Sequence, residues 1–116
     1  MKLIKSLVMA SAICGFATTS SFAGNDLVKK GEKIFMTKNL GNCIACHDIN
    51  GKNLDGPGSM GPKLQYLSAW PEEALFDKVY NPYSTNPISQ MPAFGKTGWL
   101  SDAEIKAVVA FLKTIN

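Results

Sequence analysis

Two cysteines, Cys43 and Cys46, stand three positions apart, and the only histidine of the chain, His47, follows at once. This Cys-x-x-Cys-His spacing constrains the chain more than any other feature, because it is the pattern through which proteins attach haem covalently. Thiols about one helical turn apart can each add to a vinyl group of the same porphyrin edge, and the next residue can bring its imidazole to the iron. We therefore predict one haem c, attached through Cys43 and Cys46, with His47 as an axial ligand.

Other uses of these residues stay open at this point. A structural zinc takes four ligands, commonly two pairs of Cys or His, and the remaining cysteine, Cys14, lies in a segment that we expect to be removed. A thioredoxin-type dithiol belongs to a βαβ context, and the sequence shows no alternating strands. The simplest alternative is a buried cysteine pair beside a surface histidine, which the specificity of the five-residue motif disfavours.

Residues 1–23 have the composition of a cleaved secretory signal peptide. Two early lysines precede an apolar run over residues 7–17, and Ser21-Phe22-Ala23 forms a small-x-small cleavage site. The run is well short of the roughly 20 residues needed to cross a bilayer. Cys14 precedes a glycine, as in lipid-modified cysteines, but the bulky Ile13 before it disfavours that use. We expect a mature domain of residues 24–116 in the periplasm, with no membrane insertion after cleavage.

Charge excludes some classes of partner. Removing residues 1–23 takes away Lys2 and Lys5, so the formal net charge falls from +3 to +1, and the chain contains no arginine. Without a basic stripe, binding to nucleic acid or to an anionic membrane has no support. A domain this small buries a modest core and often needs a metal or a prosthetic group to be stable.

Hydrophobic periodicity predicts an all-α domain with three helices, at about 26–38, 71–80 and 101–112. Asp26 is a suitable N-cap for the first, and Ser101 with Glu104 forms a capping box for the last. We expect the last helix to pack on the first, where Gly31 allows close approach. The long loops between the helices are rich in turn formers, and loops of that length in a small domain are usually functional.

A Gly61-Pro62 turn is the candidate for orienting His47. An imidazole that binds a metal through one nitrogen usually gives its other N–H to a fixed acceptor, and a proline carbonyl on a rigid turn would serve. The alternative is an ordinary Gly-Pro loop.

The second axial ligand of the iron must come from another residue type, since His47 is the only histidine. Met36 lies in the first helix, and Met60 adjoins the turn already placed on the His47 side. Met91 lies 44 residues beyond His47 and precedes a proline, which holds it extended and able to point inward. We predict that Met91 is the ligand and that Phe94 packs on the haem, although methionine is usually core filler.

Filling both axial positions leaves the iron without a substrate site, so the predicted activity is electron transfer. Some buried Trp and Tyr side chains donate hydrogen bonds to polar groups, which makes four aromatic residues candidates for binding the haem propionates. They are Tyr66, Trp70, Tyr80 and Trp99.

The sequence resembles class I cytochromes c over nearly the whole mature chain. The resemblance is carried by Gly31-x-x-x-Phe35, Cys43-x-x-Cys46-His47, Gly61-Pro62-x-Leu64, Met91-Pro92-x-Phe94 and the last helix. Within that class the chain is most similar to the SoxX proteins, the monohaem subunits of SoxAX complexes. The specific match includes Gly41-Asn42 before the motif and Asn86-Pro87 before Met91-Pro92-x-Phe94-Gly95.

This resemblance implies a class I cytochrome c fold, with long loops wrapped around one covalent haem. It also implies a periplasmic heterodimer with a SoxA-like cytochrome subunit. There, thiosulfate is oxidatively conjugated to a cysteine of the SoxYZ carrier at the SoxA haem. The present chain would take up the electrons, would not be catalytic alone, and would pass them to a transient redox partner protein.

Two other functions remain as alternatives. One is a general soluble electron-shuttle cytochrome c of respiration, which often carries a ring of lysines for docking. The other is a haem enzyme or gas sensor with an open iron.

Overall fold

The computed structural model describes residues 19–116, with side chains from residue 24 onward. The expected leader, residues 1–23, therefore lies outside the described residues except for the backbone of its last five. The described part contains three α helices, α1 (Thr19–Met36), α2 (Glu72–Tyr80) and α3 (Asp102–Leu112). It contains no strand within these residues, only one isolated bridge between Ile49 and Leu64. The predicted all-α class is confirmed.

Helix α1 differs from its predicted bounds. It begins at Thr19, seven residues before the expected N-cap Asp26, and ends at Met36 rather than Lys38. No proline lies between Thr19 and Asp26, so nothing interrupts the hydrogen-bond ladder there. At the other end, Gly41 donates to the carbonyl of Ile34 at 3.0 Å, which turns the chain out of the helix directly before the Cys-x-x-Cys-His motif.

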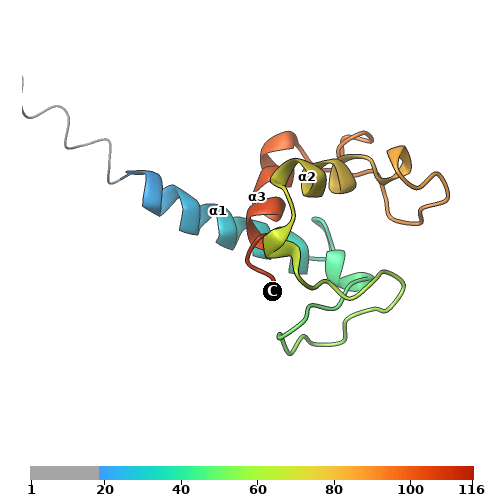
Figure 1. Cartoon of the computed structure of the whole chain (residues 1–116), viewed down its shortest axis with the longest axis horizontal. Coiled ribbons are helices and arrows are strands. Elements are labelled where there is room, and N and C mark those ends of the chain that lie inside the picture. Colours follow the sequence, from blue (N-terminus) through green and yellow to red (C-terminus); the bar gives the residue numbers. More distant parts are fainter. Residues whose placement is uncertain (1–18) are drawn as a thin grey trace, which may run out of the picture.

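The crossing of α1 and α3 forms the centre of the core (Figure 1). Gly31 is buried there, and a Cβ atom on it would collide with the carbonyl of Ala107. Next to this contact, the rings of Phe35 and Phe111 meet edge to face at 5.4 Å between centroids. Helix α3 begins with the predicted capping box, in which Ser101 and Glu104 exchange side-chain to backbone hydrogen bonds. The predicted packing of the last helix on the first is therefore confirmed.

Helix α2 contributes less to the core and begins at Glu72 after Pro71, close to the prediction. It buries Leu75 and Val79 against the rest of the core, which contains fifteen clustered side chains among the described residues. The helix ends at Tyr80, whose carbonyl accepts hydrogen bonds from the backbone N–H groups of Gly95 and Lys96 at 3.2 and 3.1 Å. The long loop after α2 is thus folded back onto the end of the helix.

Two long loop segments leave the helices on the same side of the molecule, away from the beginning of α1 (Figure 1). We call residues 37–66 the histidine segment and residues 81–100 the methionine segment. The histidine segment is closed by the bridge between Ile49 and Leu64, where Leu64 donates to Asp48 and Asn50 donates to Leu64, both at 2.8 Å.

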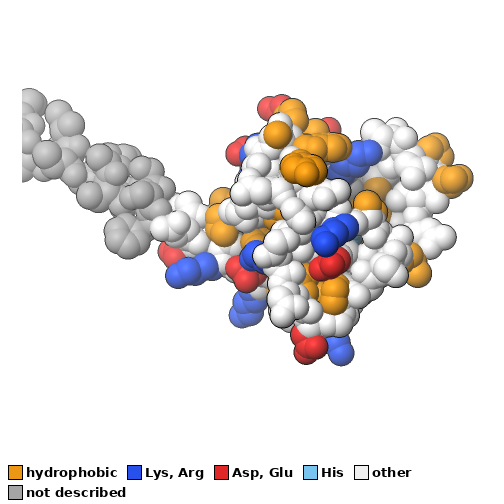
Figure 2. All heavy atoms as spheres, turned by 60° about the horizontal axis from the view of Figure 1, so that its bottom comes forward, with side chains coloured by type: hydrophobic (Ala, Val, Ile, Leu, Met, Phe, Trp, Pro, Cys, Tyr) orange, Lys and Arg blue, Asp and Glu red, His pale blue; other side chains and the backbone are white. Residues whose placement is uncertain are grey.

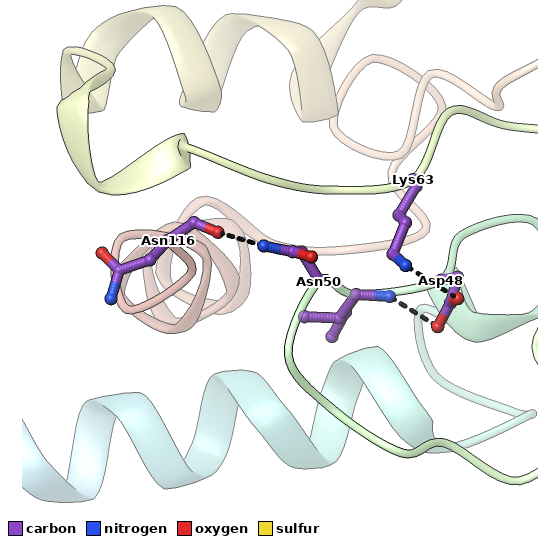
Figure 3. A network of polar contacts seen from close by, with 5 residues as sticks. Asp48, Asn50, Lys63 and Asn116 are labelled. Atoms are coloured by element: carbon purple, nitrogen blue, oxygen red, sulfur yellow. Dashed lines mark hydrogen bonds and ion pairs between the residues drawn. The ribbon is translucent and has the colours of Figure 1, made fainter.

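Polar contacts join the histidine segment to the last residues of the chain (Figure 3). The side chain of Asn50 donates to the backbone carbonyl of Asn116 at 3.0 Å. Asp48 accepts from the backbone of Ile49 at 2.8 Å and lies 3.9 Å from Lys63. Both partners of that ion pair are substantially exposed, so we assign it little weight in holding the loop. The backbone bridge and the Asn50 contact fix the segment instead.

Replacing Gly31 with alanine is predicted to lower the free energy of unfolding by about 1–3 kcal/mol, because the new methyl group must push α3 away from α1. Urea unfolding of the haem-loaded protein measures this. Ala103→Val is the matched control, since Ala103 lies exposed on α3 and its replacement should cost less than about 1 kcal/mol. Equal losses in both variants would contradict the close crossing.

Candidate functional site

Cys43 begins a short 3-10 turn, η1 (Cys43–Ala45), and Cys46 is the residue that caps its end. The turn begins after Asn42, which adopts a left-handed conformation with φ of 50°. Cys46 and His47 both donate their backbone N–H to the carbonyl of Cys43, at 3.1 and 2.9 Å. Because residues i and i+3 of a 3-10 turn eclipse one another, the turn brings the side chains of Cys43 and Cys46 to the same side. This is the arrangement that double attachment to one porphyrin edge requires.

The sulfur of Cys43 is in an environment that favours an uncharged form. As a free thiol its pKa is raised from 9.0 to about 12, mainly by burial and further by the negative charge that Cys46 would carry. Zinc and dithiol chemistry both use the thiolate, and their cysteines have lowered pKa values. Within the described part of the chain, no three His, Cys, Asp or Glu side chains gather into a metal-binding group. A neutral, covalently bonded sulfur suits this position better than a thiolate.

His47 is oriented by the turn that the sequence indicated. Its Nδ1 lies 2.7 Å from the carbonyl oxygen of Pro62. A carbonyl can only accept, so Nδ1 carries the proton and donates it, and Nε2 keeps the lone pair that a metal ion takes. The predicted hydrogen bond between His47 and Pro62 is therefore present.

Gly61 lies directly against the imidazole ring. A Cβ atom at this position would be 2.5 Å from Cε1 and 2.9 Å from Nε2 of His47. The backbone of Gly61 also donates to the carbonyl of Cys46 at 2.8 Å, and that of Gly58 donates to Ile44 at 2.9 Å. The loop is thus docked on the motif by main-chain bonds, with glycine where a side chain would displace the ring.

The other two predicted site residues come from the methionine segment. Phe94 is buried, with 7% of its surface exposed. Met91 is half-buried and packs against the core cluster, and its backbone N–H donates to the hydroxyl of Ser89 at 3.2 Å. Of the remaining methionines of the mature chain, Met36 also packs on the core while Met60 is 73% exposed. The structure thus brings Cys43, Cys46, His47 and Pro62 together, and places Met91 and Phe94 on a separate segment.

One aromatic residue has a role that the sequence did not indicate. We expected Trp99 as a candidate donor to a haem propionate, but its indole Nε1 donates to the carbonyl of Leu40 at 2.6 Å. A tryptophan has only this one donor. No sequence signal pairs residues 59 positions apart, so this contact required the structure.

The residues present fit a covalently attached haem. The Cys43 sulfur is favoured in its neutral form, the free nitrogen of His47 is Nε2, and Gly61 leaves the face of the imidazole without an opposing side chain. These are the features that attachment through two thioethers and ligation by one histidine would need.

Residues 26–112 match the family described as cytochrome c oxidase, cbb3-type, subunit III. The chain belongs to this family and is a class I c-type cytochrome. Membership of this class implies a covalently bound haem c.

Among solved structures, the chain is similar to the SoxXA crystal structure from P. pantotrophus, with 32% identity and a TM-score of 0.66. The match covers 74% of this chain and 79% of that one. The chain is therefore a SoxX-like cytochrome.

A curated relative is also similar. It is an uncharacterized lipoprotein of Aquifex aeolicus (strain VF5), 35% identical over 74 residues. The match covers 62% of this chain but only 35% of the relative, so the chain spans about a third of that protein's length. Among the residues that the structure describes, no helix combines the length and the apolar character needed to span a bilayer.

Gly61→Ala is expected to destabilise the haem-loaded protein by about 1–3 kcal/mol, because the methyl group would displace His47 or the loop. Pro62→Ala keeps the backbone carbonyl that His47 uses, so its cost should stay below about 1 kcal/mol. Urea titration followed by haem absorbance compares the two variants. A larger loss for Pro62→Ala would mean that ring rigidity, not space against the imidazole, holds the site.

Proposed function

We propose that the mature chain is a periplasmic electron-transfer cytochrome carrying one haem c, bonded to Cys43 and Cys46 and ligated by His47 and Met91. The observation that carries this proposal is the His47–Pro62 hydrogen bond, which leaves Nε2 of His47 free next to a short 3-10 turn that begins at Cys43 and is capped by Cys46. A histidine held in this way is prepared to donate to a metal.

The bound haem would supply an iron that alternates between two oxidation states and so carries single electrons. The chain's own residues set how this happens. Pro62 holds the imidazole of His47 in one orientation, which lowers the reorganisation needed when the charge changes. A thioether from Met91 is a soft ligand that favours the ferrous state and raises the reduction potential. Phe94 would pack on the porphyrin and exclude water from it.

A heterodimer with a SoxA-like cytochrome subunit is the partnership we favour. The similarity to the SoxXA structure supports it. In such a complex, thiosulfate is conjugated oxidatively to the SoxYZ carrier cysteine at the partner's haem. The present chain then accepts the electrons and passes them to a transient redox partner, so it takes part in an enzyme without being catalytic alone.

The surface of the methionine segment also favours a fixed partner over a general respiratory shuttle. No charged residue lies between Lys78 and Lys96, a stretch of seventeen residues. Within it Ile88 is 87% exposed and Tyr83 is 41% exposed. In Figure 2, the end of the molecule opposite α1, where this segment lies, presents apolar and uncharged groups. Shuttle cytochromes that dock by charge need the opposite.

The location follows from the composition of residues 1–23, which we propose are cleaved on export. Attachment of haem c through Cys-x-x-Cys-His takes place outside the bacterial cytoplasm, which agrees with this export. Sequencing the amino terminus of the purified native protein tests it directly, and a chain starting at Met1 would contradict it.

Met91→Ala is predicted to abolish the sulfur-to-iron charge-transfer band of the ferric visible spectrum. The reduction potential should fall by on the order of 100 mV, because a harder ligand or water replaces the thioether. Met60→Ala is the matched control, since the Met60 side chain is exposed and adjoins the His47 side. A band that persists in Met91→Ala would disprove Met91 as the axial ligand. A band that is lost only in Met60→Ala would show that Met60 is the ligand instead.

Ile88→Asp is expected to weaken binding to the SoxA-like subunit at least about tenfold, because a charge would be buried in an uncharged contact. Raising the salt from 50 to 500 mM should change the affinity of the unaltered pair less than about threefold. Lys52→Gln, on the histidine segment, serves as the control and should change little. Titration of the two purified cytochromes measures all three. Strong salt dependence with an inert Ile88→Asp would favour the shuttle instead.

A further inference from the structure

The indole of Trp99 makes an unusual contact for an exposed side chain. Although 62% of its surface is exposed, its Nε1 donates to the carbonyl of Leu40 at 2.6 Å. Surface tryptophans can satisfy this donor with water, so a direct bond to the main chain of a distant segment indicates a specific placement.

This contact joins the two segments of the site. Leu40 belongs to the histidine segment and Trp99 to the methionine segment. Among the hydrogen bonds and ion pairs formed within residues 24–116, it is the one that connects these two segments. All other bonds of the methionine segment run within it or to α2.

Both ends of the contact are held firmly. On one side, the Leu40 N–H donates to Thr37 at 3.1 Å, and the neighbouring Gly41 donates to Ile34 at 3.0 Å, just before the turn that carries Cys43. On the other side, the Trp99 ring meets the ring of Phe94 edge to face, with centroids 6.5 Å apart.

The Trp99 end is also tied toward Met91 through the main chain. Leu100 donates to the carbonyl of Phe94 at 3.0 Å, and Thr97 donates to that of Ala93 at 2.9 Å with its N–H and at 2.8 Å with its hydroxyl. Hydrogen bonds therefore join residues 93–100 into one compact turn, and Met91 lies two residues before it. A displacement of Trp99 from Leu40 would release the end of the segment that carries Met91.

We propose that Trp99 is a positioning residue for Met91, holding the methionine segment against the turn before Cys43 so that the Met91 sulfur stays on the iron. This inference rests on the proposed function, because it takes Met91 as the axial ligand. In this role Trp99 is not itself a ligand of the iron. It acts by making the open arrangement of the methionine segment less favourable.

The test is the competition between Met91 and an added ligand in the haem-loaded ferric protein. Imidazole can take the iron only when Met91 leaves, so its apparent affinity reports how easily the segment opens. Trp99→Phe keeps a ring against Phe94 but loses the donor. Because the loss of one hydrogen bond of ordinary net strength makes it easier for Met91 to leave the iron, imidazole should bind this variant about two- to tenfold more tightly. Loss of the charge-transfer band during the titration gives the readout.

Thr114→Val is the matched control, because the Thr114 hydroxyl donates to the carbonyl of Phe111 at 2.6 Å, so the variant loses a side-chain donor of similar kind outside both segments of the site. It should leave imidazole affinity unchanged. Urea unfolding of both variants separates global destabilisation from local opening. If Trp99→Phe lowers global stability but binds imidazole as the unaltered protein does, the positioning role is wrong while Met91 ligation stands. If the unaltered protein has no charge-transfer band, both the ligand assignment and this inference fail.

Discussion

The close crossing of α1 and α3 is the contact on which the rest of the structure depends. It is possible because Gly31 has no side chain where the carbonyl of Ala107 approaches. Cys43 follows seven residues after the end of α1, and the residues after α3, Ile115 and Asn116, contact the other side of the histidine segment. Ser68 donates to the carbonyl of Ile115 at 2.9 Å, and Asn50 donates to that of Asn116. Both ends of the loop that contains His47 are therefore set by one helix pair.

The site itself is built largely from main-chain groups. The acceptor for His47 is the Pro62 carbonyl, and the turn around it is docked on the carbonyls of Ile44 and Cys46. Main-chain acceptors do not titrate, and they cannot rotate away as side chains do. The Pro62 carbonyl therefore holds the imidazole of His47 through a group that has no protonation state of its own, which suits the role proposed for His47 as an iron ligand.

Sequence patterns predicted the parts of this structure that depend on local chemistry. The capping box at Ser101 and Glu104 fixed the start of α3, and a proline carbonyl opposite a lone histidine followed from the Gly-Pro turn. The predicted start of α1 at Asp26 was wrong, because a suitable N-cap residue permits a helix to begin there but does not prevent it from beginning earlier.

Contacts between distant segments were beyond the sequence. The bond from Trp99 to Leu40 depends on how two loops meet, and no spacing encodes it. The roles of Cys43, Cys46, His47 and Met91 toward the haem stay predictions, although the geometry around the first three agrees with them.

The histidine and methionine segments differ in charge, and this difference bears on how a redox partner is recognised. The histidine segment carries exposed lysines and acidic residues, such as Lys63 and Asp55, whereas the methionine segment carries none between Lys78 and Lys96. Long-range attraction acts on charged patches and falls off within about 8 Å at physiological salt. An uncharged face gains nothing from it and must be recognised by close packing after contact. Association through such a face has no electrostatic steering and is correspondingly slower to form. It therefore suits a subunit that stays bound better than a carrier that must exchange partners quickly.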